Sequence, residues 1–321
     1  MIAYLIRRIL WAGVLFLAVT VVTYVIFFIV PADPARLVAG KGAGPDEIAR
    51  ARHFLGLDQP VYVQYGKFLW RLVGHQSLGH SFTNRLDVNG VVASAAPVTA
   101  SLVVGGAIVW MLIALPIGIF SALRPRSLLD RVGMVFVLIG ISAHPVWIGL
   151  IFSWLFGFKL GWTPIANYCD FFNPSTECGG PVQWAYHLIL PWLTFAILFA
   201  ALYARMIRAN VTETLNEDYV RTARAKGAPE WRVLTSHVLR NAMLPVVTML
   251  GMDIGLALGG AIFTESIYGL PGLGRWAAQS LDTFDLPILQ GIVIFATLCI
   301  IVFNLLVDLL YAWIDPRIRL A

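Results

Sequence analysis

Charged residues are scarce in this sequence, and their scarcity excludes an ordinary water-soluble protein. Only 13% of the 321 residues are Asp, Glu, Lys or Arg, whereas soluble domains carry roughly 25%. Apolar residues make up 59% of the chain. A chain of this composition is expected to reside in a lipid bilayer.

Cysteine and histidine are also few, which excludes a disulfide scaffold and argues against a metal cluster. Of the three cysteines, Cys299 lies in an apolar run and is interpreted as a small core residue. Cys169 and Cys178 share the loop "NYCDFFNPSTECGGP", predicted to lie on the outer side, where a disulfide is favoured over two free thiols. The six histidines are scattered, so no metal site is predicted.

Signatures of catalysis and nucleotide binding are missing as well. "GKGAG" lacks the spacing of a phosphate-binding loop, and "GLPGLGRW" does not follow a predicted strand, as a dinucleotide-binding motif would. Ser142 and His144 are two positions apart, so on a helix they point in different directions, and no G-x-S-x-G motif is present. No catalytic residue and no cofactor bound by this chain are predicted, and an intramembrane hydrolase is disfavoured.

Six long apolar runs dominate what is present. Each reaches or nearly reaches the roughly 20 helical residues that cross a bilayer, and helices satisfy their own backbone polar groups in lipid. We therefore predict an all-α integral membrane protein surrounded by lipid, with six transmembrane helices. The runs are Ile9 to Val30, Val98 to Leu123, Val132 to Phe158, His187 to Tyr203, Leu244 to Phe263 and Ile288 to Ile314.

The distribution of Lys and Arg predicts the orientation, because cytoplasmic loops are enriched in both. One set of loops and tails is basic, so it is assigned to the cytoplasm together with both termini. These loops also account for the net charge of +5 without any nucleic-acid partner. The basic set comprises Arg7, Arg8, Arg124, Arg126, Arg131, Arg205, Arg208, Arg221, Arg224, Lys226, Arg232, Arg240, Arg317 and Arg319.

The runs and loops divide the chain into four parts. Residues 1–30 form the N-terminal tail and the first span, which is read as a retained anchor rather than a cleaved signal. Residues 31–97 form an outer segment with short amphipathic helices. Residues 98–314 form a core of five spans that includes the cytoplasmic loop 204–243, and residues 315–321 form a cytoplasmic tail.

The loop 204–243 is predicted to fold as two helices that meet at a glycine elbow. Asn216 is placed at the N-cap of the first helix, with Glu217 and Asp218 in its first turn. Gly227 ends that helix, since glycine accepts the left-handed conformation, and Pro229 is placed at the first position of the next helix. From the residues alone, the elbow is either a docking surface or a solvated connector.

Family resemblance distinguishes these readings. "YVRTARAKGAPEWRVLTSHVLRNAMLP" resembles the cytoplasmic coupling motif of the permeases of ABC importers for dipeptides and oligopeptides, A-R-A-K-G followed by H-x-L-R-N-A-x-x-P. Other stretches resemble the same family: "FLGLDQPVYVQYGKFLW", "APVTASLVVGGAIVWMLIALPIGIFSAL", "TESIYGLPGLGRW" and "DLLYAWIDPRIR".

The resemblance implies the type I ABC importer fold in a bacterial cell membrane. It further implies a second homologous permease, two cytoplasmic ATPase domains that bind ATP and Mg, and an extracytoplasmic substrate-binding protein. Nickel chelates, sugars or other small solutes are the alternative cargo. The residues that would couple this chain to the ATPase are Glu217, Asp218, Tyr219, Ala223, Arg224, Ala225, Lys226, Gly227 and His237.

Five further residues are candidates for the pathway or its gates. An acidic side chain inside a span is costly in lipid, so Asp253 either lines the pathway or is hydrogen-bonded to a neighbouring span. Pro145 is expected to bend the third span, and His144 beside it is either a gate residue or a satisfied packing residue. Glu265 and Pro271 belong to an outer gate or to an exposed connector.

Overall fold

The computed structural model describes residues 2–29, 34–40, 42–54, 57–172 and 178–314. The C-terminal tail 315–321 lies outside the described residues. Within the described part the regular structure is helical, apart from one isolated bridge between His80 and Asp87. The chain divides into two compact units, one of residues 1–99, 258–262 and 271–302 and the other of 100–257, 263–270 and 303–321.

The first unit contains the N-terminal helix, the outer segment and the start of the last helix. Tyr24, Phe68 and Ile294 pack together in one buried cluster, and Val88, Leu273 and Ile288 belong to another. Its helices are α1 (Ile2–Tyr24), η1 (Val25–Ile29), α2 (Pro34–Ala39), α3 (Pro45–Phe54), α4 (Val61–Gly74), α14 (Leu273–Thr283) and the first parts of α5 (Val88–Leu123) and α15 (Leu286–Ile314).

A buried carboxylate anchors the outer segment within this unit. Asp285 is 1% exposed, and it accepts a short hydrogen bond from the Ser81 hydroxyl and another of 3.1 Å from the backbone N–H of Phe82. The helix that follows, α5, begins at Val88 rather than at Val98, so ten residues predicted in the outer segment extend this helix. Polar and small residues at its start lie outside an apolar run but still adopt helical structure.

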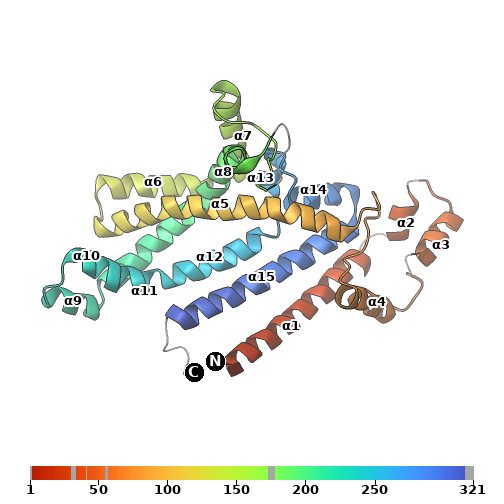
Figure 1. Cartoon of the computed structure of the whole chain (residues 1–321), viewed down its shortest axis with the longest axis horizontal. Coiled ribbons are helices and arrows are strands. Elements are labelled where there is room, and N and C mark those ends of the chain that lie inside the picture. The colour runs from red at the N-terminus through yellow and green to blue at the C-terminus, as the bar shows by residue number, and fades with distance from the viewer. Residues whose placement is uncertain (1, 30–33, 41, 55–56, 173–177, 315–321) are drawn as a thin grey trace. The chain divides into compact units, whose positions relative to one another are not determined.

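The second unit holds the middle of the chain (Figure 1). Its core centres on Trp110, which is fully buried and stacks on Phe199 with ring centroids 4.6 Å apart. Tyr203 and Ile207 of α8 are buried in the same cluster. Its helices are α6 (Leu128–Ser142), α7 (Pro145–Phe152), η2 (Ser153–Lys159), α8 (Gly180–Leu215), α9 (Asp218–Ala225), α10 (Glu230–Arg232), η3 (Val233–Leu239), α11 (Arg240–Ala242), α12 (Leu244–Ala257) and α13 (Ile262–Ile267), with the ends of α5 and α15 and part of α13 shared.

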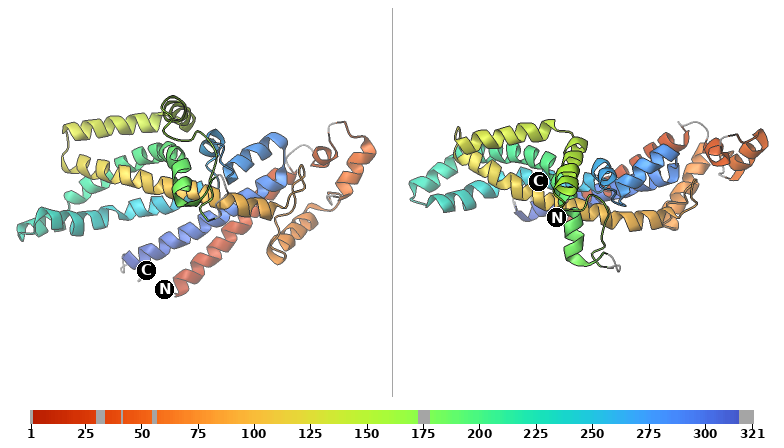
Figure 2. Two further views of the ribbon diagram at one scale, coloured as in Figure 1. Left: turned by 45° about the horizontal axis from the view of Figure 1, so that its top comes forward. Right: turned by 90° about the horizontal axis from the view of Figure 1, so that it is seen from above.

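The third apolar run is two helices, which corrects the prediction of one continuous span. The helix axis turns by 105° between residues 130–142 and 145–159, and Figure 2 shows α7 leaving α6 almost at a right angle. Pro145 lacks a backbone N–H and disfavours the helical conformation at the residue before it, so His144 is extended. The proline therefore breaks the helix here rather than bending it.

The helix in the fifth apolar run is also shorter than the predicted span of Leu244 to Phe263. α12 ends at Ala257, and a turn separates it from α13. Gly260 has φ of +130°, and a Cβ there would lie 2.7 Å from the Cα of Gly274, so only glycine lets these two backbones approach so closely. The small residues after α12 thus serve a contact inside this chain.

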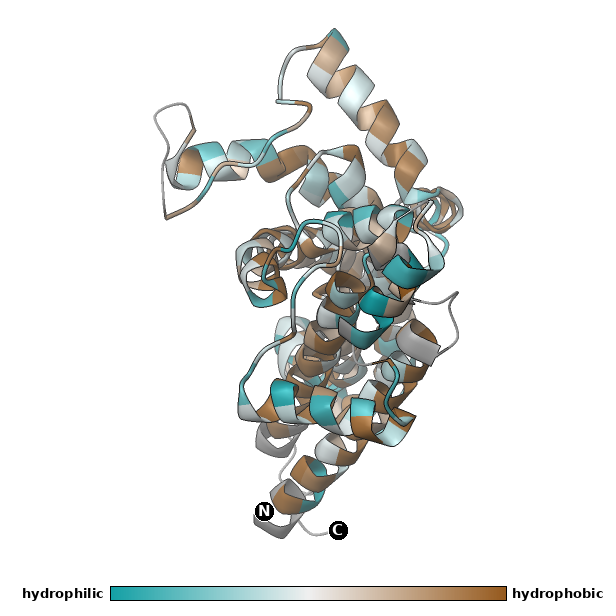
Figure 3. Ribbon diagram, turned by 90° about the vertical axis from the view of Figure 1, so that its right-hand side faces the viewer, coloured by the Kyte–Doolittle hydropathy of each residue, from teal (hydrophilic) through white to brown (hydrophobic). Residues whose placement is uncertain are grey.

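Four described helices are long and apolar enough to cross a membrane, and two bent helix pairs raise the number to six if each is one span. The four are Ile6–Phe27, Val88–Leu123, Gly180–Leu215 and Leu286–Val307. In Figure 3 brown, apolar residues dominate the helix that adjoins the marked N-terminus. The predicted all-helical membrane protein is confirmed, with six spans as the upper count.

Candidate functional site

The elbow predicted in the loop 204–243 is present, with differences at its ends. α8 continues to Leu215, so residues 204–215 are helix rather than loop. Asn216 caps the C-terminus of α8 instead of the N-terminus of α9, where Glu217 is the N-cap. Asn216 instead donates to the Thr212 carbonyl, which explains why its side chain is not available for α9.

Gly227 occupies the turn between α9 and α10. Lys226 is the C-cap of α9, and Gly227 follows with φ of +80°, the left-handed conformation expected of a glycine after a helix. Pro229 is the N-cap of α10 rather than its first helical residue, with an extended ψ of 143°. A Cβ on Gly227 would meet nothing within 4 Å, so the constraint on this position comes from the backbone and not from crowding.

Buried valines hold the two arms of the elbow together. Val220 of α9, and Val233 and Val238 of η3, are 0% exposed and belong to the same core cluster as Trp110. Figure 1 shows α9, α10 and α11 gathered at one end of α8. The apolar face of the elbow thus continues the close-packed core of the second unit.

Polar contacts close the elbow on its outer side. Arg224 donates to both carboxylate oxygens of Glu230, at 3.0 and 3.2 Å, in a bidentate pair that joins α9 to α10. The Asn241 amide donates to the Tyr219 hydroxyl at 2.8 Å and joins α9 to α11. Neither Glu230 nor Asn241 was singled out in the sequence, although the spacing of opposite charges across the glycine was a visible signal.

The predicted coupling residues differ in exposure. Arg224, Ala225, Lys226 and Gly227 are exposed, as are Glu217, Asp218 and Tyr219. Ala223 and His237 are half-buried, and Ala223 packs against the core. Trp231, which was not predicted as a site residue, is 76% exposed beside the elbow. The exposed part of the elbow therefore carries acidic, basic and aromatic side chains together.

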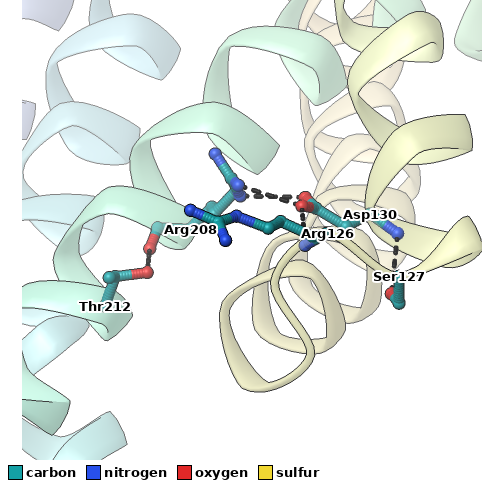
Figure 4. Close-up of polar contacts among 5 residues, drawn as sticks. All are labelled: Arg126, Ser127, Asp130, Arg208 and Thr212. Carbon is teal, nitrogen blue, oxygen red and sulfur yellow. Dashed lines mark hydrogen bonds and ion pairs between the residues drawn. The ribbon is translucent and has the colours of Figure 1, made fainter.

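An ion pair links α8 to the start of α6 (Figure 4). Asp130 is 5% exposed and pairs with Arg208, with Nε 3.0 Å from one carboxylate oxygen and the second guanidinium nitrogen 3.1 Å from the other. The backbone N–H of Arg126 donates to the same carboxylate at 2.8 Å, and Ser127 caps α6 by accepting from the Asp130 N–H. Asp130 was not predicted as a site residue.

Asp253 lies on α12 and faces α8. The Tyr203 hydroxyl donates to its carboxylate at 2.6 Å, and Tyr203 itself is 1% exposed. Asp253 is half-buried, so its carboxylate is bonded to a neighbouring helix while part of the residue stays exposed. The two alternatives for this residue, hydrogen bonding and an open pathway, are therefore compatible with each other.

The segment after α12 is packed rather than an exposed connector. Glu265 and Tyr268 are 0% and 1% exposed, and Pro271 is exposed. The Tyr268 hydroxyl lies 2.8 Å from the Thr194 hydroxyl and donates to the Gly149 carbonyl at 3.3 Å, which ties this segment to α8 and α7. Burial raises the pKa of Tyr268 to about 12. The reading of Glu265 as part of an exposed connector is therefore wrong.

His144 and Pro145 form the start of α7. The Nδ1 atom of His144 accepts from the Val146 N–H at 3.3 Å, and its ring meets Phe263 edge-on with centroids 5.1 Å apart. His144 is exposed, so it is a helix cap rather than a buried packing residue.

The structure joins Cys169 to Cys178 in a disulfide and places His187 beside it. The Sγ atom of Cys169 is 3.1 Å from Nδ1 of His187, and possible ligand atoms of the three residues lie within 4.8 Å of one another. This cluster was not predicted, because His187 lies nine residues after Cys178 in the sequence, within the apolar run that becomes α8.

Comparison with known proteins assigns the fold and the elbow to one family. The profile described as "Binding-protein-dependent transport system inner membrane component" matches residues 114–320, and the corresponding N-terminal profile matches residues 1–103. The chain belongs to this family. It is a multi-pass inner-membrane permease subunit of an ABC importer and is not itself an enzyme, since ATP is hydrolysed by separate subunits in such systems.

Relatives match the permease over its whole length. It is 39% identical over 322 residues to a peptide permease protein of Brucella suis biovar 1 (strain 1330), and 37% identical over 319 residues to a peptide transport system permease protein of Brucella abortus (strain 2308). It is 35% identical over 337 residues to the dipeptide transport system permease protein DppB of Escherichia coli (strain K12). Each alignment covers 99% of both chains.

A solved structure shares the fold. The permease matches a chain of the inward-facing MetNI methionine ABC transporter with a TM-score of 0.55 and 16% identity, covering 70% of this chain and 96% of that one. The expected ABC importer permease fold is confirmed. As a binding-protein-dependent component, the permease works with ATPase subunits and with a substrate-binding protein.

Proposed function

We propose that the permease forms half of the translocation pathway of an importer for dipeptides or oligopeptides. The relatives that match it over 99% of both chains carry peptide or dipeptide permease names. The other half of the pathway is a second, homologous permease subunit. Both termini face the cytoplasm, because the basic loops and tails, the elbow among them, share one side of the predicted topology.

The elbow carries the coupling function. Its exposed residues, from Tyr219 to Gly227, would fit into a groove of the cytoplasmic ATPase, which binds ATP and Mg. The buried valines and the Arg224–Glu230 pair make the elbow a rigid continuation of the second unit. ATP then drives alternating access because closed ATPase domains favour one arrangement of the helices over the other.

Asp253 contributes to substrate preference in this proposal. A half-buried carboxylate inside the span attracts a cationic group, such as the amino terminus of a peptide, and its hydrogen bond to Tyr203 fixes its position. The hydrogen bond from the tyrosine hydroxyl lowers the cost of placing this carboxylate in the membrane.

A permease for nickel chelates, sugars or other small solutes is the alternative, since one fold serves many cargoes. No additional observation favours it over peptides. The full-length similarity to peptide permeases is the observation that supports peptides as the cargo.

Transport in proteoliposomes tests the proposal. The permease is copurified with its ATPase, second permease and binding protein, and uptake of a labelled dipeptide mixture is followed with and without ATP. We expect ATP-dependent accumulation that requires the binding protein, and mass spectrometry of the copurified binding protein should identify bound peptides. Accumulation of a nickel chelate or a sugar without peptide uptake would refute the peptide assignment.

A further inference from the structure

The cluster of Cys169, Cys178 and His187 is not used by the proposed transport mechanism. Cys169 is 1% exposed, whereas Cys178 and His187 are half-buried. The two sulfurs of the disulfide therefore differ in access: an attacking group reaches Cys178 more easily than Cys169. His187 in turn lies against the buried sulfur, at 3.1 Å.

The position of the proton on His187 follows from a second contact. Its Nδ1 atom lies 2.9 Å from the backbone carbonyl of Gln183, and a carbonyl oxygen only accepts hydrogen bonds. Nδ1 must therefore carry the proton, which it shares between the Gln183 carbonyl and the Sγ atom of Cys169. The imidazole presents a hydrogen-bond donor to the buried sulfur.

This arrangement argues against metal binding through the same atoms. Three ligand atoms of Cys, Cys and His type within 4.8 Å are compatible in number with a thiophilic metal site. Coordination, however, requires deprotonated thiolates, and both sulfurs are joined in a disulfide, while the contact with Gln183 commits Nδ1 as a donor. The oxidised cluster therefore lacks the thiolate ligands of a metal site.

We propose that Cys169, Cys178 and His187 form a site for thiol–disulfide exchange with an external thiol. The thiolate of the attacking group bonds to Sγ of Cys178, and the Cys169–Cys178 bond breaks. The electron pair of that bond leaves on Sγ of Cys169 as a thiolate, which the Nδ1–H of His187 stabilises. A second thiolate of the reductant then attacks the mixed disulfide, so Cys178 is released as a thiolate and the reductant becomes a disulfide.

The asymmetry is what makes this an exchange site rather than an inert crosslink. Exchange is faster when the departing sulfur is stabilised as an anion, and the protonated Nδ1 of His187 lies 3.1 Å from the Cys169 sulfur, which departs when the more accessible Cys178 is attacked. Cys178 precedes α8 by two residues, so opening the bond removes the covalent tie between the start of α8 and Cys169. The site thus connects the redox state of the surroundings to one end of a long helix.

The test uses the oxidised full-length permease, reconstituted with its partner subunits, in a Cys299→Ser background. The permease is exposed to glutathione for short times, quenched with an alkylating reagent and mapped by mass spectrometry. We expect glutathione on Cys178 and the alkyl group on Cys169. Glutathione on Cys169, or on both residues equally, would overturn the proposal.

A rate comparison isolates the histidine. His187→Ala should slow the opening of the disulfide by glutathione about tenfold, the effect of losing one hydrogen bond to a charged sulfur. Tyr186→Phe is the matched control, because it alters the adjacent residue without touching either cysteine, and its rate should equal that of the unsubstituted chain. Equal rates for His187→Ala and the control would contradict the role of His187. Zn²⁺ protection of both thiols that is lost in His187→Ala would assign metal binding instead and also overturn the proposal.

Discussion

The hydroxyl of Tyr203 donates a 2.6 Å hydrogen bond to the carboxylate of Asp253, across the interface between α8 and α12. The donor is fully packed, 1% exposed and next to Trp110, whereas the acceptor is half-buried. A packed donor therefore fixes the position of a half-exposed carboxylate. A polar partner of this kind lowers the cost of an acidic side chain inside a membrane span.

Asp253→Asn should alter substrate preference more than stability. The amide oxygen still accepts from Tyr203, so the packing of α8 on α12 persists while the negative charge is lost. We expect uptake of peptides with basic side chains to fall by about tenfold relative to acidic ones, as for the loss of one ion pair in a partly wet site. Competition uptake with paired Lys and Glu peptides in proteoliposomes measures the ratio.

Tyr203→Phe is the comparison for this prediction. It keeps the charge of Asp253 and removes only the hydrogen bond, so thermal stability should fall while the preference for basic peptides remains. If Asp253→Asn left the peptide preference unchanged, Asp253 would be a structural residue only.

Substitutions at Gly227 should separate ATP hydrolysis from transport. A β-branched residue disfavours the left-handed backbone by roughly 1–2 kcal/mol, although a side chain here would meet nothing within 4 Å. Gly227→Val should therefore distort the turn, and uptake per ATP hydrolysed should drop while the complex still assembles. Uptake and phosphate release are measured on the same proteoliposomes.

Gly227→Asn is the matched control, because asparagine tolerates the left-handed conformation better than valine does. It should retain most of the transport, which would place the effect in the backbone and not in the added side-chain volume. Normal uptake by Gly227→Val would remove the elbow from the coupling mechanism.

The sequence was most informative where a local rule and the tertiary structure agree. Gly227 followed a helical pattern and needed no information beyond its own backbone preference, so the elbow was predictable. Hydropathy located the long helices α1, α5, α8 and α15, because lipid-spanning length is a property of composition.

The misplaced features depended on contacts between distant residues or on competing local rules. Asn216 is a common capping residue, but its side chain bonds back to Thr212, so it ends α8 instead of starting α9. Pro145 could either kink or break a helix, and hydropathy does not distinguish the two outcomes. His187 is nine residues from Cys178 in sequence, and only the fold of the loop onto α8 brings it to Cys169. Asp130 was likewise invisible without Arg208, 78 residues away.

Tyr268 should make stability depend on pH in the alkaline range. Its pKa is raised from 10.0 to about 12 because burial disfavours the phenolate. Below pH 10 the hydroxyl is neutral in the folded and unfolded states, and its hydrogen bonds stabilise the fold. Between pH 10 and 12 only the unfolded chain loses the proton, so this stabilisation declines as pH rises.

Thermal unfolding of the wild type and of Tyr268→Phe from pH 8 to 12 measures this effect. The wild type should be more stable by about 1 kcal/mol below pH 10, and the difference should shrink above it. Absorbance at 295 nm should show one fewer late-titrating tyrosine in the variant. A stability difference that does not change with pH would contradict the assignment.

Removing Arg208 alone should lower the free energy of unfolding more than removing Arg208 and Asp130 together. Asp130 has a side chain that is 7% exposed, so Arg208→Met leaves a buried carboxylate without its cation, at a cost of about 2 kcal/mol in the free energy of unfolding. Arg208 is 36% exposed and water can solvate it, so Asp130→Asn should cost less. The amide oxygen of the variant still accepts from the Arg126 N–H, which keeps the start of α6 in place.

The double variant of Arg208→Met and Asp130→Asn should recover part of the stability lost in Arg208→Met, because no buried charge remains unpaired. A double-mutant cycle measures the free energies of unfolding of the four proteins by SDS titration of the purified permease, and gives the coupling energy of the two side chains. If the double variant were as unstable as the sum of the two single variants, the two side chains would be energetically independent despite their contact.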